Sequence, residues 1–142
     1  MRRLQDIETP ALAVDLASFH YNMETMTAER PGSSLRPHVK AFKSTAIASV
    51  LVENGHSSFC CATIREIEGM IEAGHKSDLL LANETLDASR LGSLVESGAR
   101  VTVAVDSEAT VKVAAEAGIK EVLIDVNVGL PRCGCSLSEV ED

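Results

Sequence analysis

The residues of this chain most able to do covalent chemistry lie in one short segment around Lys40. Two lysines, one histidine and one arginine fall within positions 36–43, whereas the whole chain carries a net charge of −8. We expect this concentration of positive charge to suit a small molecule that carries a phosphate or a carboxylate. A solvated surface cluster has the same local composition, so the segment by itself leaves both interpretations open.

Lys40 is the candidate nucleophile of the segment. Burial and nearby positive charges, here those of Arg36, His38 and Lys43, disfavour the ammonium form of a lysine. The neutral amine is the form that attacks a carbonyl carbon. The pattern therefore predicts Schiff-base chemistry at Lys40.

Arg132 is the second candidate, and it lies in a loop between Gly129 and Gly134. Glycine lets a backbone approach a ligand closely, so the guanidinium could reach an anionic or heteroaromatic group. An ordinary surface turn at 130–132 explains the same residues equally well.

The elements that must position these residues alternate along the chain. Short apolar runs predict strands, and apolar residues at helical spacing predict the helices between them. Thr63 and Glu66 have the spacing of a capping box at a helix start. The predicted strands span 11–15, 35–40, 57–62, 78–82, 100–105 and 121–126, the predicted helices span 16–29, 45–53, 63–73, 86–96 and 107–117, and a further helix begins at Leu137.

Apolar strands separated by helices indicate an α/β fold with a parallel sheet, either doubly wound or a (β/α) barrel. Neither glycine fingerprint of nucleotide-binding doubly wound folds occurs, which favours the barrel. A complete barrel has eight strands, whereas we count five from Leu35 onward. The chain therefore predicts part of a TIM-type barrel, with Lys40, Glu84 and Asp106 at the carboxyl ends of strands, where barrels place reactive groups.

Composition excludes several classes of function. No apolar run approaches the roughly 20 residues of a membrane span, and no secretory signal follows the N-terminal arginines, so we expect a cytoplasmic protein. A pI near 5.0 and only four aromatic residues argue against a nucleic-acid partner. Neither the cysteines nor the histidines have metal-ligand spacing, and we expect buried free thiols. These residues are Cys60, Cys61, Cys133, Cys135, His20, His38, His56 and His75.

Five motifs occur in a fixed order along the chain. They are Thr9-Pro10 with Asp15, Arg36-Pro37-His38-Val39-Lys40-Ala41-Phe42-Lys43, Cys61-Ala62-Thr63 with Glu66, Leu81-Ala82-Asn83-Glu84, and Asp125-Val126-Asn127-Val128-Gly129-Leu130-Pro131-Arg132-Cys133-Gly134. Together they resemble the N-terminal part of the D-threonine aldolase and D-serine dehydratase family, which are fold-type III pyridoxal-phosphate enzymes related to alanine racemase. The resemblance runs from Thr9 to Cys135.

The resemblance implies roles for particular residues. Lys40, the first lysine of the His-x-Lys motif, is expected to form the internal aldimine with pyridoxal 5'-phosphate. Arg132 is expected to contact the cofactor, and we place His38 in the same site. The family pattern is His-x-Lys-x-His-Lys, and Phe42 stands where its second histidine is expected. Because phenylalanine carries no proton, we expect this departure to affect substrate choice or rate more than cofactor binding.

The resemblance also implies what lies outside these residues. Residues 1–142 correspond to the N-terminal part of the cofactor-binding barrel domain, and the C-terminal β domain is absent from them. We assign no metal ligand here, because a divalent metal (zinc, manganese or magnesium) is expected only in the complete protein. We also expect the complete protein to be a homodimer.

The resemblance therefore predicts a pyridoxal-phosphate-dependent lyase whose small-molecule substrate is a β-hydroxy D-amino acid. The reaction would be retro-aldol cleavage of D-threonine-like substrates or dehydration of D-serine, with Lys40 as the cofactor lysine. An amino-acid racemase of the same fold and a non-catalytic regulatory module that binds the cofactor are the alternatives. The function is assigned to the complete protein, since these 142 residues alone need not be active.

Overall fold

Four parallel strands form the single sheet of the structure, a computed structural model that describes residues 4–130 and 132–140. They are β1 (Phe59–Cys61), β2 (Leu79–Leu81), β3 (Val101–Val105) and β4 (Glu121–Ile124), and they lie in chain order across the sheet. Predictions that concern residues 1–3, Pro131 and residues 141–142 fall outside the described residues.

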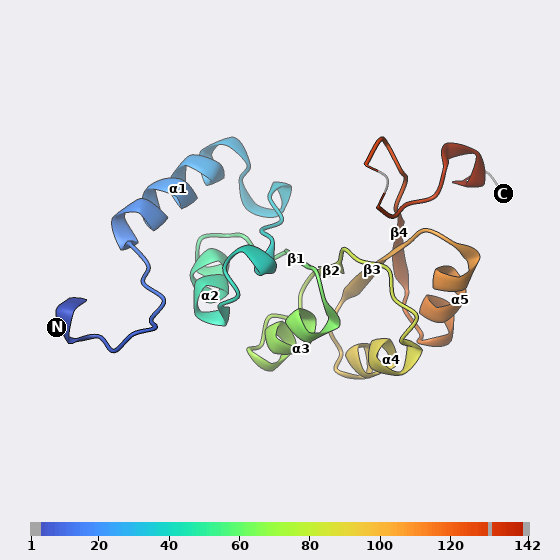
Figure 1. Cartoon of the computed structure of the whole chain (residues 1–142), viewed down its shortest axis with the longest axis horizontal. Helices are drawn as coiled ribbons and strands as arrows, with labels where there is room; N and C mark the ends of the chain where they lie inside the picture. The colour runs from blue at the N-terminus through green and yellow to red at the C-terminus, as the bar shows by residue number, and fades with distance from the viewer. Residues whose placement is uncertain (1–3, 131, 141–142) are drawn as a thin grey trace.

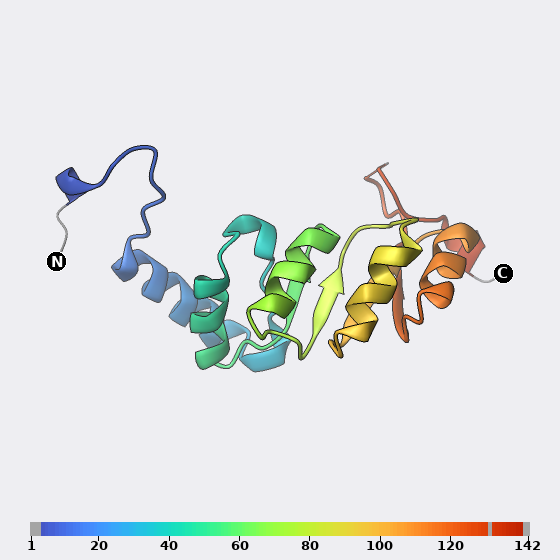
Figure 2. The same cartoon turned by 90° about the horizontal axis from the view of Figure 1, so that it is seen from below.

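The helices that connect the strands lie along one side of the sheet. α3 (Ile64–Glu72), α4 (Ala88–Glu96) and α5 (Glu108–Glu116) follow β1, β2 and β3 in turn and stand side by side in both views (Figure 1, Figure 2). A doubly wound sheet reverses its strand order and covers both faces with helices. Sequential order with helices on one side is the arrangement of a barrel wall, so the prediction of a partial (β/α) barrel is confirmed.

The strands are short and apolar because they form the core of this wall. Phe59, Leu79 and Val101 are aligned across three strands, and Cys61, Leu81 and Val103 form the next aligned row. These two rows are buried, as are all five residues of β3. Helix residues such as Ile67, Met70 and Leu91 cover them from one side and are also buried.

Two further helices precede the sheet, α1 (Leu16–Glu29) and α2 (Thr45–Glu53), and both match the predicted bounds. Each of the five α-helices begins at a side chain that accepts a hydrogen bond from the backbone N–H three residues on, which satisfies a donor that the helix leaves free. These residues are Asp15, Ser44, Thr63, Asp87 and Ser107. None of the helices in the described ranges is long and apolar enough to cross a membrane.

Two predicted strands are wrong. The segment 35–40 is reduced to an isolated bridge between His38 and Cys60, and residues 11–15 are exposed and pair with no described strand. Short 3-10 turns at Gly32–Ser34 and Val39–Ala41 enclose the first segment and leave it too few residues for a ladder. The sheet therefore has four of the six predicted strands, and four where we counted five from Leu35 onward. At the other end, the helix predicted from Leu137 is a 3-10 turn, Leu137–Val140.

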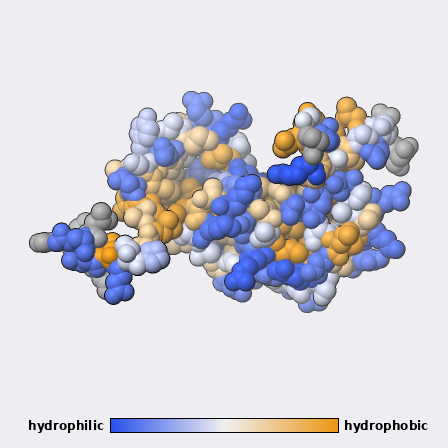
Figure 3. All heavy atoms as spheres, viewed as in Figure 1, coloured by the Kyte–Doolittle hydropathy of each residue, from blue (hydrophilic) through white to orange (hydrophobic). Residues whose placement is uncertain are grey.

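The sheet ends in an exposed apolar edge at β4. Val122, Leu123 and Ile124 are each about half exposed. β4 pairs with β3 on one side, and on its other side no described strand pairs with it. Apolar atoms also reach the surface over the C-terminal end of the chain (Figure 3). Unpaired edge strands present free N–H and C=O groups to other chains.

We predict that a polypeptide of residues 1–142 associates through β4 and that Leu123→Lys weakens the association. A lysine on an edge strand opposes strand addition and should lower the association constant about threefold or more. Sedimentation velocity over a range of concentrations measures this constant. Leu12→Lys is the matched control, because Leu12 is 83% exposed and lies outside the sheet. A monomer at every concentration, or equal effects of the two substitutions, would contradict the prediction.

Candidate active site

The carboxyl ends of the four parallel strands meet at one edge of the sheet, and candidate residues follow three of the strands there. Glu84 follows β2, Asp106 follows β3, and Asp125 directly follows β4. Lys40 lies two residues after His38, which forms an isolated parallel bridge with Cys60 of β1. The predicted position of Lys40 at the carboxyl edge therefore holds, although it stands after a bridge and not after a full strand.

Lys40 lies in the 3-10 turn Val39–Ala41 and is exposed. Its backbone N–H donates a hydrogen bond to Nδ1 of His38 at 3.3 Å. Among the described residues, its side-chain amine has no ion pair and no hydrogen bond. The amine is therefore open to a ligand from the edge of the sheet.

The cations around Lys40 do not act as predicted. Arg36 forms a two-pronged ion pair with Asp78, with N–O distances of 2.9 and 2.8 Å, and Lys43 binds Glu66 at 2.6 Å. A carboxylate thus balances each of these two charges. Together with the exposure of Lys40, this balance makes the prediction of a buried lysine pressed by neighbouring cations wrong.

The pKa of His38 depends on the nearby charge of Lys40. Partial burial lowers the pKa of His38, and the positive charge of Lys40 lowers it further. His38 is therefore neutral at pH 7, the form in which Nδ1 can accept the N–H of Lys40. The structure brings Lys40 and His38 together as predicted.

The turn that carries Lys40 closes on Lys43. The N–H of Lys43 donates to the carbonyl of Val39 at 2.7 Å, and Lys43 has a φ of 45°, which makes it the sole non-glycine residue with positive φ in the described chain. Its ammonium group reaches Glu66, whose other carboxylate oxygen accepts the N–H of Ala62 at 2.7 Å. One carboxylate thus links the end of the turn to the end of β1.

The capping box predicted at Thr63 and Glu66 is half correct. The Thr63 hydroxyl accepts the N–H of Glu66 at 3.2 Å, as the motif requires. Glu66, however, accepts the N–H of Ala62, one residue before the cap, and its remaining oxygen binds Lys43. Sequence spacing could not show this choice, because Lys43 is 23 positions away.

Arg132 is exposed in the loop after β4. Two backbone hydrogen bonds fix the loop: the N–H of Asn127 donates to the Cys135 carbonyl, and the N–H of Cys135 donates to the Asp125 carbonyl. The N–H of Gly134 also donates to the Asp106 carboxylate at 3.3 Å. A Cβ on Gly134 would lie 2.7 Å from the nitrogen of Asn127. Lys40 precedes β1 in the chain and Arg132 follows β4, and no hydrogen bond or ion pair joins their side chains in the described part of the chain.

The structure gathers one group of donor atoms that sequence reasoning did not assign. Side-chain atoms of Glu84, Asp125 and Cys133 lie within 4.8 Å of one another, a spacing that could hold a metal ion. The signal available in the sequence was that each follows a strand at the same edge. The nearby Arg132 guanidinium lowers the pKa of Cys133. The hydrogen bond from the Cys133 thiol to Asp125 and the partial burial of the thiol have the larger effect, so the pKa of Cys133 is raised. At neutral pH Cys133 is therefore a thiol, whereas metals bind the thiolate.

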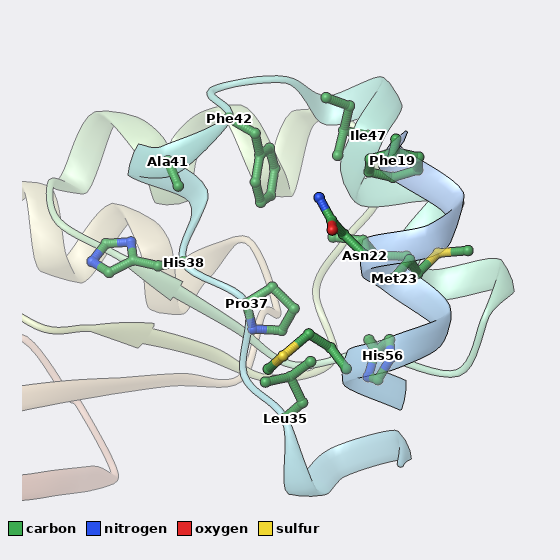
Figure 4. A pocket seen from close by; sticks show the side chains of 12 residues that line it. Phe19, Asn22, Met23, Leu35, Pro37, His38, Ala41, Phe42, Ile47 and His56 are labelled. Atoms are coloured by element: carbon green, nitrogen blue, oxygen red, sulfur yellow. The ribbon is translucent and has the colours of Figure 1, made fainter. Parts of the chain in front are cut away.

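The side chain of Phe42 points away from the carboxyl edge of the sheet. Its ring points into an apolar cavity of about 480 Å³ between α1 and the turn, on the same side as Phe19 and Ile47, whereas the ring of His38 points the other way (Figure 4). Phe42 also packs against the buried core. The side chain at position 42 in this chain therefore serves packing under α1.

All four cysteines are free thiols, as predicted, but their burial differs. Cys61 is fully buried in β1, and this burial raises the pKa of its thiol to about 12. Cys60, Cys133 and Cys135 are partly exposed, so the prediction of buried thiols holds for Cys61 alone.

Comparison with known proteins gives consistent matches. The family described as "Alanine racemase, N-terminal domain" matches residues 14–142. A D-threonine aldolase of Arthrobacter sp is 32% identical over 94% of this chain, and a D-threo-3-hydroxyaspartate dehydratase of Delftia sp. (strain HT23) is 35% identical over 56% of it. The crystal structure of D-threonine aldolase from Filomicrobium marinum superposes with a TM-score of 0.79 at 34% identity, covering 94% of this chain and 38% of that one. The chain spans 37% of the Arthrobacter protein and 21% of the Delftia protein.

We predict that Gly134→Ala destabilises the protein more than Gly74→Ala does. Both glycines have φ near 90°, so alanine at either position costs about 1 kcal/mol or more in backbone strain. Only at Gly134 does the new Cβ also meet backbone atoms, whereas nothing lies within 4 Å at Gly74. Denaturant titration should show an additional loss of roughly 1–2 kcal/mol in unfolding free energy for Gly134→Ala. Equal losses would show that the loop accepts the side chain.

We predict that His38 titrates below the ordinary histidine pKa of about 6.5 and that Lys40→Met moves its pKa upward. The upward shift follows because the substitution removes the positive charge of Lys40. The stabilising contribution of neutral His38 is complete above pH 6.5 and is lost as the pH falls through the lowered pKa, because Nδ1 then carries a proton. NMR titration of the imidazole protons measures the pKa. Lys112→Met, on α5, is the control and should leave the pKa of His38 unchanged. An unchanged pKa in Lys40→Met would show that the charge of Lys40 does not lower the pKa of His38.

Proposed function

Because this chain belongs to the family of alanine racemase N-terminal domains, we propose that it is the N-terminal part of a pyridoxal-phosphate-dependent lyase that acts on a β-hydroxy D-amino acid. The observation that carries the proposal is the amine of Lys40, exposed at the carboxyl edge of the sheet and free of a described carboxylate partner. Since the chain spans 37% of its aldolase relative, the activity is proposed for the whole protein.

Lys40 fits a cofactor that bears a carbonyl. A lysine amine attacks a carbonyl carbon only when it is unprotonated, and an ion pair to a carboxylate holds it protonated. Lys43 is held in such a pair, whereas Lys40 is not. Lys40 is therefore the lysine of the 36–43 segment whose amine has no described carboxylate partner.

Pyridoxal phosphate, when bound, supplies an electron sink for bonds broken at the α-carbon of an amino acid. In our proposal the Nζ atom of Lys40 would hold the cofactor, and the same amine would move a proton at the α-carbon of the substrate. His38 accepts the Lys40 N–H and orients the turn, and Arg132 binds the cofactor from the loop after β4. We assign the binding of the cofactor phosphate to segments beyond these residues. We also assign to such segments the ligands of a divalent metal (zinc, manganese or magnesium) that polarises the substrate hydroxyl.

The substrate class rests on the names of the relatives. D-threonine and D-threo-3-hydroxyaspartate, in the names of the aldolase and the dehydratase, both carry a hydroxyl on the β-carbon. We propose that this protein takes a substrate of the same kind and either cleaves its Cα–Cβ bond or removes the hydroxyl. We further propose that the complete protein is a cytoplasmic homodimer.

We predict that pyridoxal phosphate added to the intact protein gives an absorption band near about 420 nm, which marks its attachment to a lysine amine. Lys40→Ala should lose the band, because it removes the attacking nitrogen. Lys112→Ala is the control, since Lys112 is an exposed lysine on α5. An equal band in Lys40→Ala would remove Lys40 from its role.

The products formed by the same samples separate the alternatives. An aldehyde with glycine from D-threonine indicates the aldolase, and a keto acid indicates the dehydratase. Inversion of the α-carbon without either product would indicate a racemase. A band with no turnover of any D-β-hydroxy-amino acid would indicate a regulatory module that only binds the cofactor.

A further inference from the structure

We propose that Glu66 is a positioning residue that holds the Lys40 turn in its reactive conformation by binding Lys43. The inference deepens the proposed function and rests on the role of Lys40 in it. Glu66 touches no reacting atom in this proposal and acts through the backbone of residues 38–43. The structure supports it by the conformation of Lys43, by the anchoring of Glu66 and by the position of Lys40 between two fixed points.

Lys43 has an unfavourable backbone conformation that the turn requires. Its φ of 45° lies in the left-handed region, which glycine adopts freely and which costs a residue with a side chain about 1–3 kcal/mol. In this conformation its N–H reaches the carbonyl of Val39 at 2.7 Å and ends the turn. Turns of this kind normally close on glycine or asparagine. A lysine at the closing position therefore needs an interaction that offsets the strain.

The ion pair with Glu66 provides that interaction. Lys43 Nζ lies 2.6 Å from the Glu66 carboxylate, whose side chain is 9% exposed, whereas that of Lys43 is 67% exposed. Exposed pairs contribute little to stability, but a hydrogen bond to a largely buried charged group contributes more. Partial burial alone raises the pKa of Glu66, but the bonds from Lys43 and Ala62 outweigh it and hold the pKa below its usual value. Glu66 is therefore ionised and paired at neutral pH.

Glu66 is itself fixed at the end of β1. Its second carboxylate oxygen accepts the N–H of Ala62 at 2.7 Å, and its backbone N–H is held by the cap residue Thr63. The other end of the turn is also tied to β1, because His38 bridges Cys60. Lys40 thus lies midway between two attachments to one buried strand. Releasing the Glu66 attachment leaves the turn held at one end.

None of the other ion pairs in the described chain involves a residue with positive φ. Arg36–Asp78, Arg90–Glu68, Arg100–Glu121 and Lys112–Glu116 all join residues whose backbone φ is negative. Glu68 and Arg90 are the useful comparison, because Glu68 lies on α3 two residues after Glu66 and also forms an ion pair with a distant residue, at 2.8 Å. Removing that pair should affect α3 and α4 but not the turn.

The experiment compares Glu66→Gln, Glu68→Gln and the double variant Glu66→Gln with Lys43→Gly in the intact protein. Two quantities are measured: amide hydrogen exchange of Ala41 and Phe42 without cofactor, and the rate at which added pyridoxal phosphate forms its 420 nm band. Both amides donate within the turn, to His38 and Val39. For Glu66→Gln we expect exchange about tenfold faster and attachment about tenfold slower.

Rescue by glycine separates positioning from a direct effect of charge. Glycine at position 43 adopts the left-handed conformation without a partner, so the double variant should return both quantities to within about twofold of the original protein. Glu68→Gln should change neither. Unchanged exchange in Glu66→Gln, or slowed attachment that glycine does not restore, would overturn the proposal. If the original protein itself forms no band, the proposed function fails, and the exchange rates alone decide whether Glu66 holds the turn.

Discussion

Parallel pairing of strands in chain order is the constraint on which the rest of this structure depends. Each parallel step needs a crossover, and the helices α3, α4 and α5 supply them along one side of the sheet (Figure 2). Because every strand then points the same way, the residues that follow the strands collect at one edge. Lys40, Glu84, Asp106 and Asp125 come from distant parts of the sequence and share that edge for this reason alone.

Much of this arrangement could be predicted from the sequence, because it depends on local patterns. The bounds of α1 and α2 follow from apolar spacing and capping residues, and the buried rows of β1 to β3 are continuous apolar runs. The edge position of Lys40 followed from the order of the elements. Segments 35–40 and 11–15 were mistaken for strands because an apolar run does not reveal whether a partner strand lies beside it.

The parts of the site that could not be predicted depend on contacts between distant residues. Arg36 and Lys43 look alike in the sequence as neighbours of Lys40, yet Asp78 binds Arg36 and Glu66 binds Lys43, whereas no described carboxylate binds Lys40. The positive φ of Lys43 has no sequence signal, since glycine or asparagine is the residue expected there. A residue that breaks a local rule in this way marks a place where tertiary contacts override local preference.

The apolar cavity beside Phe42 has a consequence for the order in which the molecule opens. α1 contributes a single buried side chain, Met23, and the cavity separates much of its inner face from the turn. Opening a helix with so little buried area costs far less free energy than opening the sheet. α1 is therefore the first helix to detach in native fluctuations. Each detachment exposes Phe42 and the other apolar residues that line this cavity to water.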